Sequence, residues 1–200
     1  MKLDFSPVRN GELKLSEFAQ NLTVADLRDM TNASIDTILT IIADLDDADV
    51  TFDPTDPLAD DPYAKEGEEK IGWSIAHLVV HVTASSEEWA TYGSILARGI
   101  PYPREPRIRY ETDWKSVTTK AQCLQRLEES RRMRLGYLDA FPDHPSLDTY
   151  RDMSENFVNK YGQCNAIVAV LLGLMHEEGH FAQFRDVHDQ AIAAKVGSRI

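Results

Sequence analysis

The sequence predicts an all-α protein, a bundle of long helices joined by long loops. Four long stretches carry apolar residues at the three- and four-residue steps of an amphipathic helix, and no stretch alternates convincingly as a strand. Proline-containing segments separate these stretches, and a helix does not continue through them. A chain of 200 residues can bury a full core, so we expect a single domain over residues 1–200.

The first helix is expected over about residues 23–45. Thr23 is placed to cap it, with Asp26 three residues later completing a capping box. Its apolar stripe, which must pass through Ser34, consists of Leu27, Met30, Ile38, Ile41 and Leu45.

An acidic segment follows the first helix. Residues 44–69 hold eleven carboxylates and three prolines against one lysine, and we expect a long solvated loop over residues 46–69. A calcium-binding loop is the alternative, but the carboxylates lack the spacing of that motif.

The second helix is expected over about residues 71–97. One face carries Trp73, His77, Val80, His81 and Ala84, and Trp89 and Tyr92 extend the apolar surface. The proline-rich residues 99–106 end it.

Two further helices complete the bundle. The third is expected over about residues 116–140, with Arg and Glu facing outward, and its buried positions are Leu124, Leu127, Leu135 and Leu138. The fourth, over about residues 161–195, is the most apolar, and Gly197 comes soon after its end.

Composition limits the function classes. The net charge of −12 argues against binding to nucleic acid or to anionic lipid. The N-terminus lacks an apolar signal segment, and the longest apolar runs are too short to span a bilayer. Cys123 and Cys164 are then expected to be free, buried thiols in a cytoplasmic protein.

The histidines suggest a metal site. HLVVH places His77 and His81 one turn apart, and HEEGH places His176 and His180 one turn apart. Side chains at i and i+4 share a helix face and can chelate one ion, and a third ligand must come from another helix. His144 and His188 are expected at the surface.

HEEGH also matches H-E-x-x-H, the zinc-binding helix of many peptidases. One class of these peptidases takes its third ligand from a Glu downstream of the motif, but no Glu follows Glu178. Another class has a glycine and a third histidine ligand where this chain has Gln183 and Asp186. We expect the helix to run straight through the motif, which leaves a zinc peptidase as a minor alternative. Glu177 is expected to face solvent, and a role as a general base is the alternative. A di-iron bundle needs two Glu-x-x-His units, and only Glu177 to His180 supplies one.

Two motifs then point to a family. WSIAHLVVH (73–81) resembles the W-S-x6-H signature of the DinB-like superfamily, which includes relatives of bacillithiol S-transferases and mycothiol-dependent isomerases. HEEGHFAQ (176–183) resembles the family's second motif, with Ala182 where relatives commonly carry Gly. The resemblance covers roughly residues 22–190. It implies an antiparallel four-helix bundle (DinB/YfiT-like), often dimeric, with a three-histidine metal site.

The resemblance assigns the ligands and suggests a function. It places the metal on His81, His176 and His180 and leaves His77 out. One divalent transition metal (Zn, Ni or Fe) is expected, with a low-molecular-weight thiol as co-substrate. The implied activity is metal-dependent thiol S-transfer or hydrolysis at an open coordination position. The alternative is a non-enzymatic, metal-stabilised bundle that binds a small ligand or a protein partner.

The sequence assigns no catalytic or cofactor-binding residue. The family resemblance suggests a homodimer, helped by Trp89 and Tyr92 as surface aromatics. The acidic loop is long for the family and is expected to cover one end of the bundle.

Overall fold

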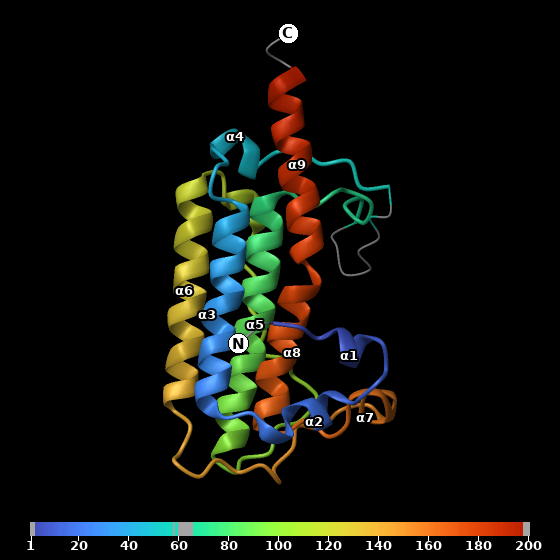
Figure 1. The fold of residues 1–200 in the computed structure, drawn as a ribbon, viewed down its shortest axis with the longest axis vertical. Helices are drawn as coiled ribbons and strands as arrows, with labels where there is room; N and C mark the ends of the chain where they lie inside the picture. The colour runs from blue at the N-terminus through green and yellow to red at the C-terminus, as the bar shows by residue number, and fades with distance from the viewer. Residues whose placement is uncertain (1–2, 58, 60–65, 198–200) are drawn as a thin grey trace.

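The computed structural model describes residues 3–57, 59 and 66–197, and this part of the chain is helical without strands. Its main helices are α3 (Val24–Ile41), α5 (Ile75–Ala97), α6 (Lys120–Asp139) and α8 (Ala166–Gly179), with α9 (Phe181–Gly197) extending beyond α8 (Figure 1). The predicted fold class is confirmed. Among the described helices, none is long and apolar enough to cross a membrane.

Two antiparallel helix pairs form the bundle. In Figure 1, α3 and α8 run upward while α5 and α6 run downward. Two contacts fix the pair α3 and α6: Arg28 near the start of α3 bonds Asp139 at the end of α6, and Lys120 at the start of α6 bonds the Ala43 carbonyl just beyond α3. The parallel neighbours α5 and α6 are joined by a long crossing segment, residues 98–119.

Glycines allow α5 and α8 to pack closely. A Cβ on Gly173 would lie 2.9 Å from Ser86 Cα, and a Cβ on Gly93 would lie 2.6 Å from a Val170 methyl. The Ser86 hydroxyl donates to the Gly173 carbonyl across the same interface, at 3.2 Å. This close approach brings the histidines of the two helices together.

Caps set the helix boundaries. Thr23 caps α3 with Asp26 in the predicted capping box. Ser74 caps α5 and Thr119 caps α6, so these helices begin a few residues later than the predicted starts at about residues 71 and 116. A short 3-10 turn, η2 (Trp114–Ser116), occupies the expected start of the third helix.

The predicted fourth helix, over about residues 161–195, is two helices, α8 and α9, and a short helix precedes them. α7 (Glu155–Tyr161) ends at Gly162, which has a φ of 85°, and α8 starts after the cap Asn165. The expectation that a helix runs straight through HEEGH is wrong at one residue, because α8 ends at Gly179 and His180 is its C-cap. Gly179, a weak helix former, precedes this break. Figure 1 shows α9 continuing upward from α8.

The acidic segment is more structured than predicted. Asp46 caps a short helix, α4 (Asp47–Val50), and the buried Asp49 pairs with Lys195 of α9. Further along, Thr55 exchanges two hydrogen bonds with Gln190, so this part of the segment covers one end of the bundle. The sequence analysis expected a loop here because it did not consider that Asp46, Asp47 and Asp49 stabilise the N-terminus of a short helix. The part of the predicted loop at residues 58 and 60–65 lies outside the described residues.

The core agrees with most of the predicted apolar positions. Leu127 and Leu138 of α6 are buried, whereas Leu124 and Leu135 are half-buried. Both cysteines are buried free thiols, and burial raises the pKa of each to about 12. The prediction that the arginines of α6 face outward is wrong for Arg134, which is 2% exposed.

Candidate metal centre

Three histidines converge where α5 meets the end of α8. His81 comes from α5, His176 from the last turn of α8, and His180 caps the same helix. One ring nitrogen from each lies within 4.8 Å of the other two, and the three are half-buried. The three predicted ligands therefore form a group that can hold a metal ion.

The spacing fits imidazole ligands. The Nε2 atoms of His81 and His176 are 3.2 Å apart. Tetrahedral zinc with Zn–N bonds of about 2.0–2.1 Å would separate its ligand nitrogens by ~3.3 Å. The ring of His180 is 4.7 Å from that of His176 and 5.3 Å from that of His81, centroid to centroid. Two ligand atoms thus stand at coordination spacing, and the third needs only a small adjustment.

Two of the histidines are held in the form that binds metal. Burial, followed by the neighbouring His180, His81 and Arg109, lowers the pKa of His176 to about 3. Burial also lowers the pKa of His180, despite the contact with Gln183 that raises it. Both rings are neutral at pH 7, and a metal does not have to displace a proton from them.

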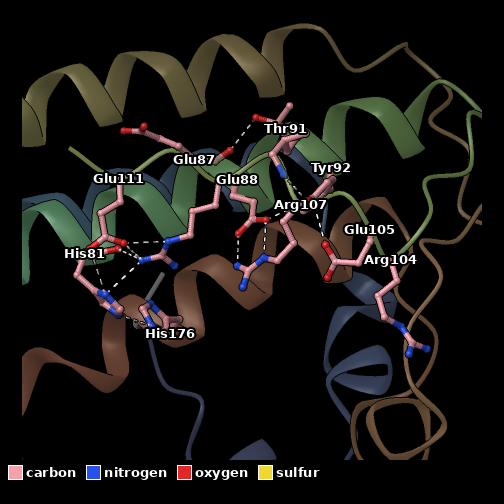
Figure 2. Close-up of polar contacts among 12 residues, drawn as sticks. His81, Glu87, Glu88, Thr91, Tyr92, Arg104, Glu105, Arg107, Glu111 and His176 are labelled. Atoms are coloured by element: carbon pink, nitrogen blue, oxygen red, sulfur yellow. Dashed lines mark hydrogen bonds and ion pairs between the residues drawn. The ribbon is translucent and has the colours of Figure 1, made fainter. Parts of the chain in front are cut away.

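Each of two ligands has a hydrogen-bonding partner for its other ring nitrogen. His180 Nδ1 lies 2.8 Å from Gln183 Oε1, so an Nδ1–H donates to the amide and leaves Nε2 free. His81 Nδ1 lies 3.6 Å from Glu111 Oε1 and 3.2 Å from Arg109 Nη2. Figure 2 shows Glu111 directed at His81 from the segment that crosses α5.

Aromatic rings form one wall of the centre. Trp73 packs on His81 and His180, with ring centroids 4.5 and 5.9 Å apart. His77 is stacked between Trp73 and Trp114 and is 8% exposed. Its ring is part of this stack and lies outside the cluster of three.

Glu177 does not face solvent, so that prediction is wrong. Its side chain is completely buried between α3, α6 and α8, where it accepts hydrogen bonds from Ser34 Oγ and, at 2.9 Å, from Arg134 Nη1. The carboxylate is therefore part of a buried ion pair. Its hydrogen bond from Ser34 accounts for the polar residue within the apolar stripe of α3.

The remaining predicted positions lie away from the centre. Asp186 is exposed and accepts from Gln190, so it is outside the cluster. His144 is exposed, and His188 pairs with Asp44 and Asp189 at the surface.

Sequence reasoning missed Arg109 and Glu111. Both belong to an extended segment, residues 107–111, that lies along α5. Alternate side chains point to opposite sides: Arg107, Arg109 and Glu111 contact α5, whereas Ile108 and Tyr110 line a cavity of about 280 Å³ between α5 and α6. That cavity contains none of the three histidines. The alternation R-I-R-Y-E was the available signal.

Comparison with known families agrees with this fold. The chain matches the DinB superfamily over residues 14–184, which is most of its length, and it belongs to that superfamily. No match was found among curated proteins, and none among solved structures.

Proposed function

We propose that His81, His176 and His180 bind one divalent transition metal with an open coordination position, and that the protein is a metal-dependent thiol S-transferase or hydrolase. The observation that carries this proposal is the donor set. Three imidazoles converge from two helices, and in the described residues no fourth His, Cys, Asp or Glu joins them. Three protein ligands plus an open position are typical of catalytic sites, whereas structural zinc sites have four protein ligands.

The proposed metal is zinc, nickel or ferrous iron. Imidazole donors suit these ions better than calcium or magnesium, which prefer oxygen ligands. Once bound, such an ion lowers the pKa of a coordinated thiol or water and so supplies a nucleophile.

The surrounding residues would orient the ligands and limit access. Gln183 fixes the ring of His180, and Trp73 covers one side of His81 and His180. The three rings are half-buried rather than fully enclosed. A small co-substrate such as a low-molecular-weight thiol suits this arrangement.

The acid–base inventory favours thiol transfer over peptide hydrolysis. A peptidase with H-E-x-x-H uses its Glu to activate water, but Glu177 is buried and engaged by Arg134 and Ser34. A thiol held at such an ion would be deprotonated near neutral pH, with its proton passing to solvent, so no dedicated base would be needed. We therefore propose that the zinc-loaded protein has no peptidase activity.

A non-enzymatic role is the second candidate. Among the described residues, the carboxylates beside the cluster are paired with cations: Glu111 pairs with Arg109, and Glu178 pairs with Arg9. The lack of an unpaired carboxylate that could act as a base favours the non-enzymatic role. A metal-stabilised bundle would then bind a small ligand or a protein partner through the same centre.

Turnover separates the two candidates. The zinc-, nickel- and iron-loaded proteins are incubated with a panel of low-molecular-weight thiols and electrophiles. Turnover that depends on the metal and disappears in His81→Ala supports the enzyme. Stoichiometric metal without turnover on any pair favours the non-enzymatic bundle.

We also propose a homodimer, on family membership alone. The expected aromatic support is wrong for Tyr92, which is completely buried, and Trp89 is half-buried. Light scattering at micromolar concentration should give twice the chain mass, and a monomer mass would refute the proposal.

A further inference from the structure

We propose that Glu111 and Arg109 act in opposite directions on the metal affinity of the centre, by selecting which nitrogen of His81 carries the proton. This inference rests on the proposed metal site. It concerns two positioning residues, which contact a ligand rather than the metal.

The two side chains meet the same ring nitrogen with opposite hydrogen-bonding capacity. Glu111 Oε1 is 3.6 Å from His81 Nδ1, and Arg109 Nη2 is 3.2 Å from it. A carboxylate only accepts hydrogen bonds and a guanidinium only donates them. Arg109 also donates to the His81 carbonyl at 3.1 Å, which holds the guanidinium beside the ring.

Each partner stabilises a different tautomer of the neutral ring. When Nδ1 carries the proton, Glu111 can accept a hydrogen bond from Nδ1–H. Nε2 then keeps the lone pair that a metal needs. When Nε2 carries the proton, Nδ1 accepts from Arg109, and Nε2–H points toward His176 Nε2, 3.2 Å away. The proton only moves between the two nitrogens of one ring, so no net proton is gained or lost.

Charge acts in the same direction as tautomer choice. The Glu111 carboxylate forms an ion pair with Arg109 and lies beside the His81 ring. A carboxylate next to a ligand attracts a divalent cation, and a guanidinium there repels it. Arg109 also donates two hydrogen bonds to Glu111, from Nε and Nη2, so each residue sets the position of the other.

Contacts farther along α5 hold this segment in place independently. Arg107 pairs with the buried Glu88 (Figure 2). The Ile108 N–H donates to the Tyr92 hydroxyl at 3.1 Å. Substitution of Arg107 therefore weakens the contact between this segment and α5 but keeps both Arg109 and Glu111, the partners of His81.

The test measures zinc affinity by competition with a chromophoric chelator. In Glu111→Ala, affinity should fall by about 10- to 100-fold, the usual effect of losing the hydrogen-bond partner of a ligating histidine. In Arg109→Met, affinity should rise by roughly 3- to 10-fold, the effect of removing a partly screened charge from the surroundings of a divalent ion. Arg107→Met should stay within about 2-fold of the native protein.

Histidine ¹⁵N chemical shifts in the metal-free proteins give the second readout. Relative to the native protein, Arg109→Met should move His81 toward the Nδ1–H form and Glu111→Ala toward the Nε2–H form. A purely structural role would not shift the tautomer in opposite directions.

Three results would overturn the inference: a loss of affinity in Arg109→Met, a loss in Arg107→Met as large as in Glu111→Ala, or no movement of the tautomer in either variant. Failure of the native protein to take up zinc would instead refute the proposed function. The tautomer measurement needs no metal, so the two failures are distinguishable.

Discussion

Removing the charge of Glu177 should destabilise the protein strongly, although Glu177 lies within the sequence motif of a zinc peptidase. In Glu177→Gln the side chain keeps its shape and can still accept from Ser34, but Arg134, whose side chain is 3% exposed, loses its counter-charge. Breaking a buried ion pair by removing one partner costs about 3–5 kcal/mol. For a chain of 200 residues this corresponds to a fall in Tm of roughly 6–20 °C.

A double variant separates the ion pair from other effects. Glu177→Leu with Arg134→Met replaces both charges by apolar groups, and it should recover most of the stability because no unpaired charge remains buried. Urea unfolding followed by circular dichroism measures all three proteins. A loss below about 1 kcal/mol in Glu177→Gln, or a double variant less stable than the single, would contradict the ion-pair account.

Three further predictions concern the centre and the helix interface. Gln183→Ala should weaken zinc binding by about 10-fold or more, because His180 Nδ1 loses its acceptor, and unchanged affinity would refute this. Gly173→Ala should cost roughly 1–3 kcal/mol in urea unfolding, because the added Cβ would lie 2.9 Å from Ser86 Cα, and a neutral substitution would show that α5 and α8 can separate freely. The metal-free protein should lose stability as the pH falls below about 6.5. The folded His176, with a pKa of about 3, stays neutral there while the unfolded chain takes up a proton. In His176→Leu this loss between pH 6.5 and pH 3 should be smaller, and an identical pH profile would contradict the reasoning.

Local patterns predicted the parts of the fold that depend on local physics. Thr23 and Asp26 form their capping box because cap and partner are three residues apart. His176 and His180 share a helix face for the same reason, since their spacing is one turn. The family resemblance, rather than spacing, chose His81 over His77, and the stack of His77 between two tryptophans explains physically why His77 is outside the cluster.

Tertiary contacts decided the features that prediction missed. Glu177 is one position from His176, about 100° round the helix, and periodicity alone did not reveal that Arg134 of another helix would meet it there. Arg109 and Glu111 reach His81 from a segment outside any helix, where no helical spacing predicts a contact.

Metal content of purified protein tests the central claim most directly. After zinc loading and dialysis, the native protein should hold one zinc per chain, and His81→Ala should hold almost none. The matched control is His77→Ala, one turn earlier on α5, which should keep its zinc because His77 lies outside the cluster. Full zinc occupancy in His81→Ala, or loss of zinc in His77→Ala alone, would contradict the three-histidine centre.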